Sequence, residues 1–324
     1  MEISVVDQSP IFTNTNADQA IKDSVELAQY SDQIGLKRFW LAEHHGSNSF
    51  AGCSPEILIP RIASSTKNIR VGSGGVMLMH YSPYKVAENF RLLESMFPRR
   101  IDLGLGRAPG SDPFQAGALA YGSKTTGPEF FPTKMNDLRS FLSNQTSETK
   151  SFENVNVTPG LGDVPDTWLL VSSEQGADYA SFFGLPMSLA YFINQDCLHL
   201  AKPYRENFQK SIFGDSPQVS VAVFAICAET NEEANLLASS ASIWRENVSK
   251  GIFGPFPTLE EATKKIKDKD KEEGKSIVGD QKYVEGQLMK ILEETNADEL
   301  KIITICESMS SKKESYRLIK EIFS

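Results

Sequence analysis

Short apolar runs alternate with helical patterns along the whole chain of 324 residues, and this alternation limits the possible folds more than any other feature. Eight of these runs are typical of buried strands. They cover residues 2–7, 38–42, 69–78, 100–106, 167–173, 186–192, 219–227 and 300–306. Strands that alternate with helices form parallel β/α units, and eight units favour a closed TIM barrel over an open doubly wound sheet. We therefore predict an α/β fold, a TIM barrel, in a single domain over residues 1–324.

Signals for helix starts lie between these runs. Asn16 with Gln19 three residues later forms a capping-box pattern for a helix over 17–34. A serine followed by proline starts a helix near residue 54 and another over 83–97. We expect a further helix over about 284–295, before the last strand.

Two segments exceed the minimal β/α repeat. Residues 146–166 look like an insertion before strand five, and residues 250–283 like an insertion between helix seven and strand eight. The second segment carries charges of both signs, which is typical of a solvated helix or loop. The alternative interpretation is a mobile lid over the barrel mouth.

Composition narrows the class of partner. A net charge of −9 and a pI near 5.1 disfavour binding to nucleic acid or anionic lipid. No apolar run reaches the roughly 18 residues of a membrane span, and the first residues do not resemble a signal peptide, so we expect a cytoplasmic location. The four cysteines form no CxxC pair, which argues against a zinc site. A small-molecule partner is the best expectation.

Polar residues and glycines follow five successive strand runs. In a parallel barrel the functional groups gather at the C-terminal ends of the strands. The candidates are Asp7 and Gln8, Glu43 to His45, Gly74 and Gly75 with His80, Arg107, and Ser172 and Ser173. We expect these residues to surround one ligand site.

The pair His44 and His45 suggests a metal site at first sight. However, adjacent residues in an extended chain project to opposite sides, whereas metal ligands must converge on one point. The chain also has no HExxH motif. We therefore predict no metal, and one imidazole that acts as an acid, a base or a hydrogen-bond donor. The alternative is that both rings only bind loop backbone.

Arg107 is the best candidate for a phosphate anchor, because a guanidinium group gives permanent, bidentate binding of anions. Ser172 and Ser173 at the start of a helix offer hydroxyl and amide donors for the same anion. The stretch after Gly104 lacks the third glycine of a dinucleotide fingerprint, so a Rossmann site is excluded. Glycines at strand ends also allow a flat ligand to approach the backbone closely.

Five stretches resemble the bacterial luciferase-like flavin-dependent monooxygenase family. They are "FWLAEHH", "SPEILIPRIA", "IRVGSGGVML", "HYSPYKVAENFRLLESMFPRRIDLGLGRAPG" and "GLPMSLAYFIN". The resemblance implies a TIM barrel that forms a dimer, here a homodimer, through helices at about 54–67 and 83–97. It also implies reduced FMN, supplied by a separate flavin reductase, which reacts with O₂ to give a flavin hydroperoxide that oxygenates a small organic substrate.

The resemblance also implies roles for single residues. His44 matches the catalytic histidine, and Glu43 a flavin-contacting residue. Gly74 and Gly75 would lie against the flavin ring, near a position where the family often has a non-proline cis peptide. The flavin phosphate would be held by Arg107, Ser172, Ser173 and Gly176. Gln8, His45 and His80 are candidates for substrate contact.

The chain departs from the family pattern in two places. Gly106 stands where light-emitting members carry a reactive cysteine, so luminescence is not expected. Glu174 follows the serine pair, and its carboxylate would weaken phosphate binding unless it points away. Two alternatives stay open, a flavin-binding relative without catalysis and an F420-dependent dehydrogenase of the same family. The sequence does not predict the substrate.

Overall fold

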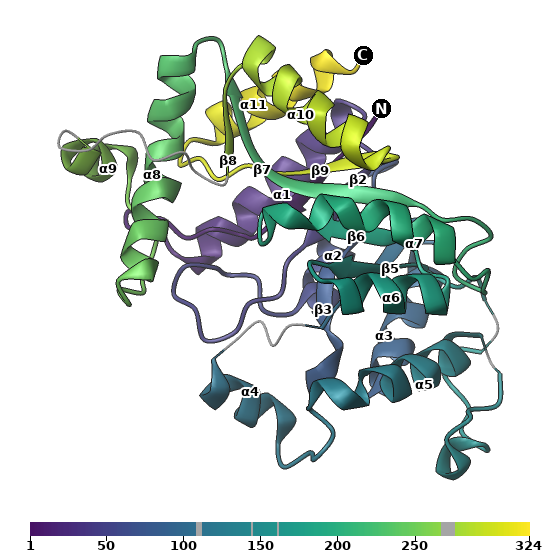
Figure 1. Cartoon of the computed structure of the whole chain (residues 1–324). Coiled ribbons are helices and arrows are strands. Elements are labelled where there is room, and N and C mark those ends of the chain that lie inside the picture. Colours follow the sequence, from purple (N-terminus) through teal and green to yellow (C-terminus); the bar gives the residue numbers. More distant parts are fainter. Residues whose placement is uncertain (108–111, 144, 161, 267–275) are drawn as a thin grey trace.

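The computed structural model describes residues 1–107, 112–143, 145–160, 162–266 and 276–324 (Figure 1). Its strands are β1 (Glu2–Asp7), β2 (Arg38–Leu41), β3 (Arg70–Met77), β4 (Ile101–Gly106), β5 (Asp166–Val171), β6 (Met187–Ala190), β7 (Val219–Ala228), β8 (Ser276–Asp280) and β9 (Glu299–Ile303). They pair in parallel in the order β6-β5-β4-β3-β2-β1-β9-β7-β8. Because β6 also pairs with β7, eight of the strands close a barrel. The predicted TIM barrel is confirmed.

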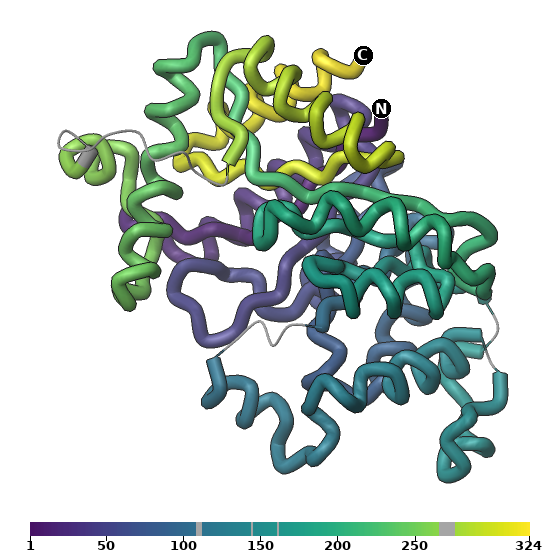
Figure 2. Tube along the Cα trace, viewed as in Figure 1, coloured from purple at the N-terminus to yellow at the C-terminus, as the bar shows by residue number. Residues whose placement is uncertain are grey.

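The helices lie outside this barrel. They are α1 (Ala17–Gln33), α2 (Pro55–Ala63), α3 (Pro83–Met96), α4 (Pro113–Ala120), α5 (Phe131–Ser143), α6 (Glu174–Phe183), α7 (Ala201–Asn207), α8 (Asn231–Ser249), α9 (Leu259–Ile266), α10 (Gln281–Thr295) and α11 (Met309–Ile322). The predicted cap of α1 is present, since Asn16 accepts a hydrogen bond from the Gln19 amide at 3.0 Å. Figure 2 traces α8 and α9 to one side of the barrel.

The mixed-charge part of segment 250–283 begins with α9, in agreement with the predicted solvated helix or loop. The segment also contains β8, a strand that the sequence pattern does not predict, and β8 pairs with the C-terminal half of β7, from Phe224 to Ala228. The eighth strand of the barrel itself is β9. The lid interpretation falls partly on residues 267–275, which lie outside the described residues. The other insertion, 146–166, holds a short 3-10 helix at Lys150–Phe152 and reaches the start of β5.

Large side chains fill the inside of the barrel. Trp40 and Trp168 are buried, and their rings pack edge to face with centroids 5.7 Å apart. Val6 and Ile303 belong to the same cluster. The interior is therefore a packed core that leaves ligands only the barrel ends.

Charged side chains close the N-terminal end of the barrel. Arg38 donates from Nη1 to both carboxylate oxygens of Asp102 at 2.8 Å, and from Nε to Glu299 at 3.0 Å. Arg70 binds Asp102 at 2.7 Å and Asp166 at 2.9 Å. Burial alone would raise the pKa of Asp102, but Arg38 and Arg70 hold it below its ordinary value. Each buried charge here has an opposite charge beside it.

Candidate active site

The candidate residues meet at the other end of the barrel. The pairing of β1 with β2, β2 with β3 and β3 with β4 places Asp7 beside Leu41, Leu41 beside Ser73, and Met77 beside Gly106. The residues that follow these strands therefore share one edge. The structure thus brings the five predicted strand ends to the same mouth.

Glu43 is the centre of a buried hydrogen-bond cluster. Its carboxylate lies 2.7 Å from Nε2 of His45 and accepts hydrogen bonds from the Tyr81 hydroxyl at 2.7 Å and the Met77 amide at 3.1 Å. Burial and the Glu43 carboxylate raise the pKa of Tyr81, so its phenol stays protonated and can donate. With three protein partners, Glu43 is well placed to orient His45 and Tyr81.

His44 has a different environment from His45. Its ring stacks on Phe50 with centroids 4.3 Å apart, and its Nδ1 is buried with no hydrogen-bond partner in the described part of the chain. Burial, with a smaller effect of the neighbouring His45, lowers the pKa of His44 to about 4. The imidazole is therefore neutral at pH 7, and its Nδ1 lacks the hydrogen bond that a buried polar atom normally makes.

The peptide bond between Gly74 and Gly75 is cis, as the resemblance led us to expect near this position. A Cβ on Gly75 would lie 2.7 Å from the Gly104 carbonyl oxygen, so β4 leaves no room for a side chain there. A Cβ on Gly74 would lie 3.0 Å from Cβ of Trp40. Packing against neighbouring strands is thus a sufficient reason for glycine at position 75.

Arg107 and Ser173 form a second polar cluster at the mouth. Nη2 of Arg107 donates to the Ser173 hydroxyl at 3.0 Å, Nη1 donates to Gln175, and the guanidinium lies over the Tyr179 ring at 5.8 Å. Ser173 is also the N-cap of α6. No carboxylate pairs with Arg107 within the described residues. A cation without a counter-ion beside a helix start has the donor groups that a phosphate requires.

The model of one protein family, described as luciferase-like monooxygenase, matches residues 1–289. The chain belongs to the luciferase-like monooxygenase family. It is 37% identical over 235 residues to the N-acetyl-S-alkylcysteine monooxygenase of Bacillus subtilis, covering 72% of this chain and 70% of the relative.

Solved structures agree with this membership. The crystal structure of apo-MsnO8 superposes with a TM-score of 0.90 and is 33% identical, covering 99% of this chain and 98% of the other. The oxygenating constituent of 3,6-diketocamphane monooxygenase from Pseudomonas putida, a type II Baeyer-Villiger monooxygenase solved with FMN, has a TM-score of 0.73. It is 18% identical, covering 98% of this chain and 96% of the other. The more distant match supports the fold, and the family indicates a monooxygenase.

Several predicted residues play structural parts in this member of the family. Asp7 accepts hydrogen bonds from the Ser24 hydroxyl at 2.5 Å and the Ser9 amide at 3.2 Å. The bond to Ser24 connects the end of β1 to α1. The Ser172 carbonyl accepts a hydrogen bond from the Asn194 side chain at 2.9 Å. The Gly176 amide donates to the Ser173 hydroxyl at 3.4 Å. Of these groups, only the Ser173 hydroxyl also contacts Arg107.

The remaining predicted residues surround the Glu43 cluster or line the mouth. Gln8 is buried just past β1, and His80 is buried with its ring 6.4 Å from that of His45. Glu174 is exposed and forms no ion pair with Arg107. Among the described residues, no group of three or more His, Cys, Asp and Glu side chains could hold a metal ion. No helix in the described ranges is long and apolar enough to cross a membrane.

Sequence reasoning missed four residues of the site. They are Phe50, Tyr81, Gln175 and Tyr179. Tyr81 follows the candidate His80 directly, so a search for phenols near the strand ends would have found it. Tyr179 lies one helical turn beyond Gln175 on α6, which is the spacing that puts two residues on one helix face. Phe50 reaches His44 from a loop, and no local pattern predicts that contact.

Proposed function

We propose that the protein is an FMN-dependent monooxygenase that receives reduced FMN from a separate reductase. The observation that carries this proposal is the Arg107–Ser173 pair at the start of α6, on the same barrel mouth as the neutral His44. Guanidinium, hydroxyl and helix-start donors suit the phosphate of FMN. Membership of the luciferase-like monooxygenase family supports the reaction class.

Reduced FMN supplies, when bound, the two electrons and the activation of O₂ that oxygen transfer needs. In the overall reaction, substrate, O₂ and reduced FMN give oxygenated substrate, water and FMN. His44 binds or moves a proton at Nδ1, which it can do because the ring is neutral at pH 7. Glu43 is a positioning residue that holds His45 and Tyr81 beside the mouth.

The relative that is 37% identical over 235 residues suggests a substrate class to test. That protein is named for N-acetyl-S-alkylcysteines, which contain a thioether. A sulfur compound is therefore the first substrate to try. The apolar and aromatic surface around Phe50 and His44 suits an alkyl thioether.

An anaerobic titration with reduced FMN tests the proposal. ¹⁸O₂ is then admitted with N-acetyl-S-methylcysteine or methyl phenyl sulfide as probe, and mass spectrometry measures the ¹⁸O content of the products. We expect tight binding of reduced FMN and one ¹⁸O atom in the sulfoxide. No binding of reduced FMN, together with tight retention of F420, would favour the dehydrogenase and sink the monooxygenase.

A His44→Gln variant separates catalysis from mere flavin binding. We expect reduced FMN to bind as in the wild type, while ¹⁸O transfer falls by about 10²- to 10⁴-fold, the range for loss of a proton-transferring group. His199→Gln is the matched control, because His199 lies on the surface. If His44→Gln reoxidised FMN and oxygenated the probe like the wild type, the chain would be a flavin carrier.

We also propose that two copies pair through α2 and α3, as the family resemblance implies. Ile57 on α2 is 72% exposed, and Leu92 and Met96 on α3 are 53% and 52% exposed. Leu92 and Met96 lie four residues apart, on one face of α3. Large exposed apolar side chains on neighbouring helices suit a protein interface. Sedimentation of Ile57→Asp and Leu92→Asp should show monomers, and an unchanged dimer would rule this surface out.

A further inference from the structure

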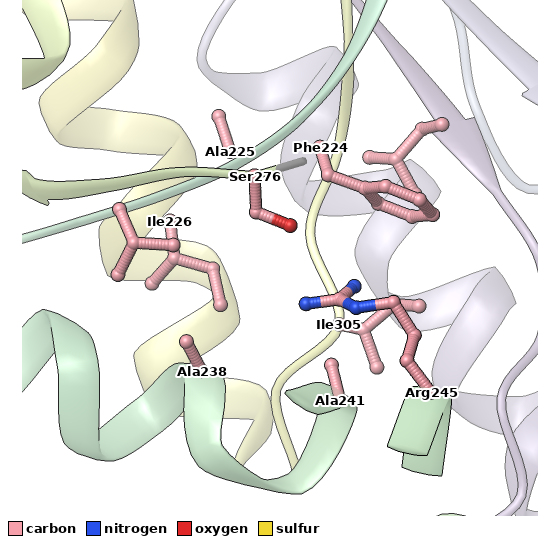
Figure 3. Close-up of a pocket in the computed structure, with 10 residues that line it drawn as sticks. Phe224, Ala225, Ile226, Ala238, Ala241, Arg245, Ser276 and Ile305 are labelled. Atoms are coloured by element: carbon pink, nitrogen blue, oxygen red, sulfur yellow. The ribbon is translucent and has the colours of Figure 1, made fainter. Parts of the chain in front are cut away.

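Arg245 of α8 places its guanidinium in a recess formed by the C-terminal half of β7, the start of β8 and the C-terminal end of β9 (Figure 3). Phe224 and Ile226 of β7, Ser276 of β8 and Ile305 after β9 line this recess. The recess has about 230 Å³ of empty space, part of it open to solvent. The recess admits about one water molecule, which is the size of a single head-group atom and not of a whole ligand.

Arg245 carries a positive charge that no described residue neutralises. Within the described residues, no carboxylate and no hydrogen-bond acceptor lies within bonding distance of its guanidinium, which lies over the Phe224 ring at 5.6 Å. Burial lowers the pKa of Arg245, and no acidic side chain in the described part of the chain opposes this effect. An arginine remains protonated at neutral pH even so. A partly buried cation without a partner is costly, and a bound anion would remove that cost.

An aromatic surface links this cation to His44. The His44 ring stacks on Phe50, and Phe50 packs edge to face on Trp244 with centroids 5.5 Å apart. Trp244 precedes Arg245 on α8. Phe50, Trp244 and Phe224 all border the apolar cluster at this end of the barrel. Arg245 and His44 therefore each lie against an aromatic ring that borders the same apolar cluster.

This cation is separate from the proposed phosphate site. Arg107 follows β4, whereas the Arg245 recess lies at β7, β8 and β9, and β5 and β6 stand between them in the barrel. Two arginines of the mouth therefore lack a carboxylate partner among the described residues, and they lie far apart along the ring of strands. If the FMN phosphate takes Arg107, Arg245 is left for a second anion.

We propose that Arg245 binds a carboxylate group of the substrate, while the apolar remainder of the substrate lies along the Phe50 and Phe224 surface toward His44. This inference rests on the proposed monooxygenase function, since it assigns a substrate class to that same mouth. A planar carboxylate matches the planar guanidinium fork. Its oxygens are also small enough for the narrow recess. The substrate is then an apolar acid, and neutral analogues of it bind more weakly.

Calorimetric titration of the FMN-loaded protein tests this assignment with two probes of equal size, hexanoate and hexanamide. The wild type should bind hexanoate at least about tenfold more tightly, since hydrogen bonds to charged groups have this strength. In Arg245→Gln that preference should disappear. Arg245→Lys should keep part of it, because the charge remains but the fork is lost.

Two controls keep the result interpretable. Arg317→Gln removes an arginine from the exposed face of α11 and should leave both titrations unchanged. Thermal unfolding and FMN affinity are measured for every variant. Arg245→Gln should bind FMN like the wild type and be at least as stable, because it removes an unpaired charge. Equal binding of the two probes by the wild type, or a preference that persists in Arg245→Gln, would overturn the proposal.

Other outcomes separate this inference from the proposed function. If Arg245→Gln weakens FMN binding, Arg245 belongs to the cofactor site and the substrate assignment is wrong. If the wild type binds neither FMN nor reduced FMN but still prefers hexanoate in the unloaded state, the monooxygenase proposal fails while the anion site stands.

Discussion

The arginines at the two ends of the barrel differ in whether a carboxylate of the described residues pairs with them. At the N-terminal end, Arg38 and Arg70 share the buried carboxylate of Asp102, and Glu299 adds a second partner for Arg38. At the C-terminal end, neither Arg107 nor Arg245 has a carboxylate partner among the described residues. The same side chain is thus neutralised by the protein at one end and left for other groups at the other.

We expect the paired arginines to contribute to stability and the unpaired arginines to ligand binding. Charges that are paired within the chain hold strands together and offer nothing to a ligand, whereas an unpaired buried cation is a cost that a bound anion removes. The unpartnered Nδ1 of His44 belongs to the same end as the unpaired arginines. TIM barrels in general place their chemistry at this end and their stabilising residues at the other. Substitutions at the two ends should therefore change different measurements.

The largest effect is expected at the N-terminal end, for Asp102→Ala. The variant leaves Arg38 and Arg70 short of their shared buried carboxylate, and the free energy of unfolding should fall by about 3–5 kcal/mol, the cost of breaking a buried pair. Urea unfolding measures this change. Asp166→Ala is the control, because its half-exposed carboxylate pairs with the same arginines and should lose about 1 kcal/mol or less. Equal losses in both variants would contradict the distinction between buried and exposed pairs.

The next effect is expected at the C-terminal end, for Arg107→Ala. FMN affinity should fall by about 1.5–3 kcal/mol, roughly 10- to 150-fold, because a charged hydrogen bond to phosphate is lost. The free energy of unfolding should change little, since no carboxylate is left unpaired. Fluorescence titration with FMN measures the affinity. The FMN affinity of Arg107→Lys should lie between those of the wild type and Arg107→Ala. Unchanged FMN affinity would place the phosphate elsewhere.

A smaller effect concerns the pH dependence of stability. The pKa of His44 is about 4 in the folded chain and about 6.5 when unfolded. Between these values the unfolded chain takes up a proton that the folded chain does not, so the free energy of unfolding falls as pH drops from 6.5 to 4. Over this pH range the free energy of unfolding of His44→Gln should fall by about 1–2 kcal/mol less than that of the wild type. The value is smaller than the pKa difference alone would give, because the ring is partly exposed. Urea unfolding at several pH values, with His199→Gln as control, measures it. Parallel pH curves for wild type and His44→Gln would contradict this.

The fold could be predicted from the sequence because most barrel strands are short and largely apolar runs, which is typical of parallel strands buried on both faces. β8 was missed for the opposite reason. Its five residues, from Ser276 to Asp280, follow a charged stretch, and they form a strand only by pairing with the far half of β7. Pairing between distant segments leaves no local pattern.

The sequence predicts those candidate site residues that come directly after a strand. That rule predicts Glu43, His44, Arg107 and Ser173 from the sequence alone. It could not find Arg245, because a charged residue in the middle of α8 has the pattern of a solvated helix face. Its position in the mouth depends on how α8 packs over β7 and β8, which only the tertiary structure gives.

The smallest effect is expected for Lys301→Met at the N-terminal end. The Lys301 ammonium is buried, lies 4.0 Å from the ring centroids of Trp40 and Trp168, and pairs with Glu299 at 3.4 Å. Burial lowers its pKa to about 8, against the opposing effect of Glu299.

Methionine keeps the apolar stem between the tryptophan rings and removes the buried charge, while Glu299 retains Arg38. The free energy of unfolding should therefore change by about 1 kcal/mol or less, because replacing a buried charge with an apolar side chain of similar size is often nearly neutral. Urea unfolding beside Asp102→Ala measures the contrast. A loss for Lys301→Met as large as that for Asp102→Ala would mean that the N-terminal cluster acts as one unit, in which no charge can be removed without cost.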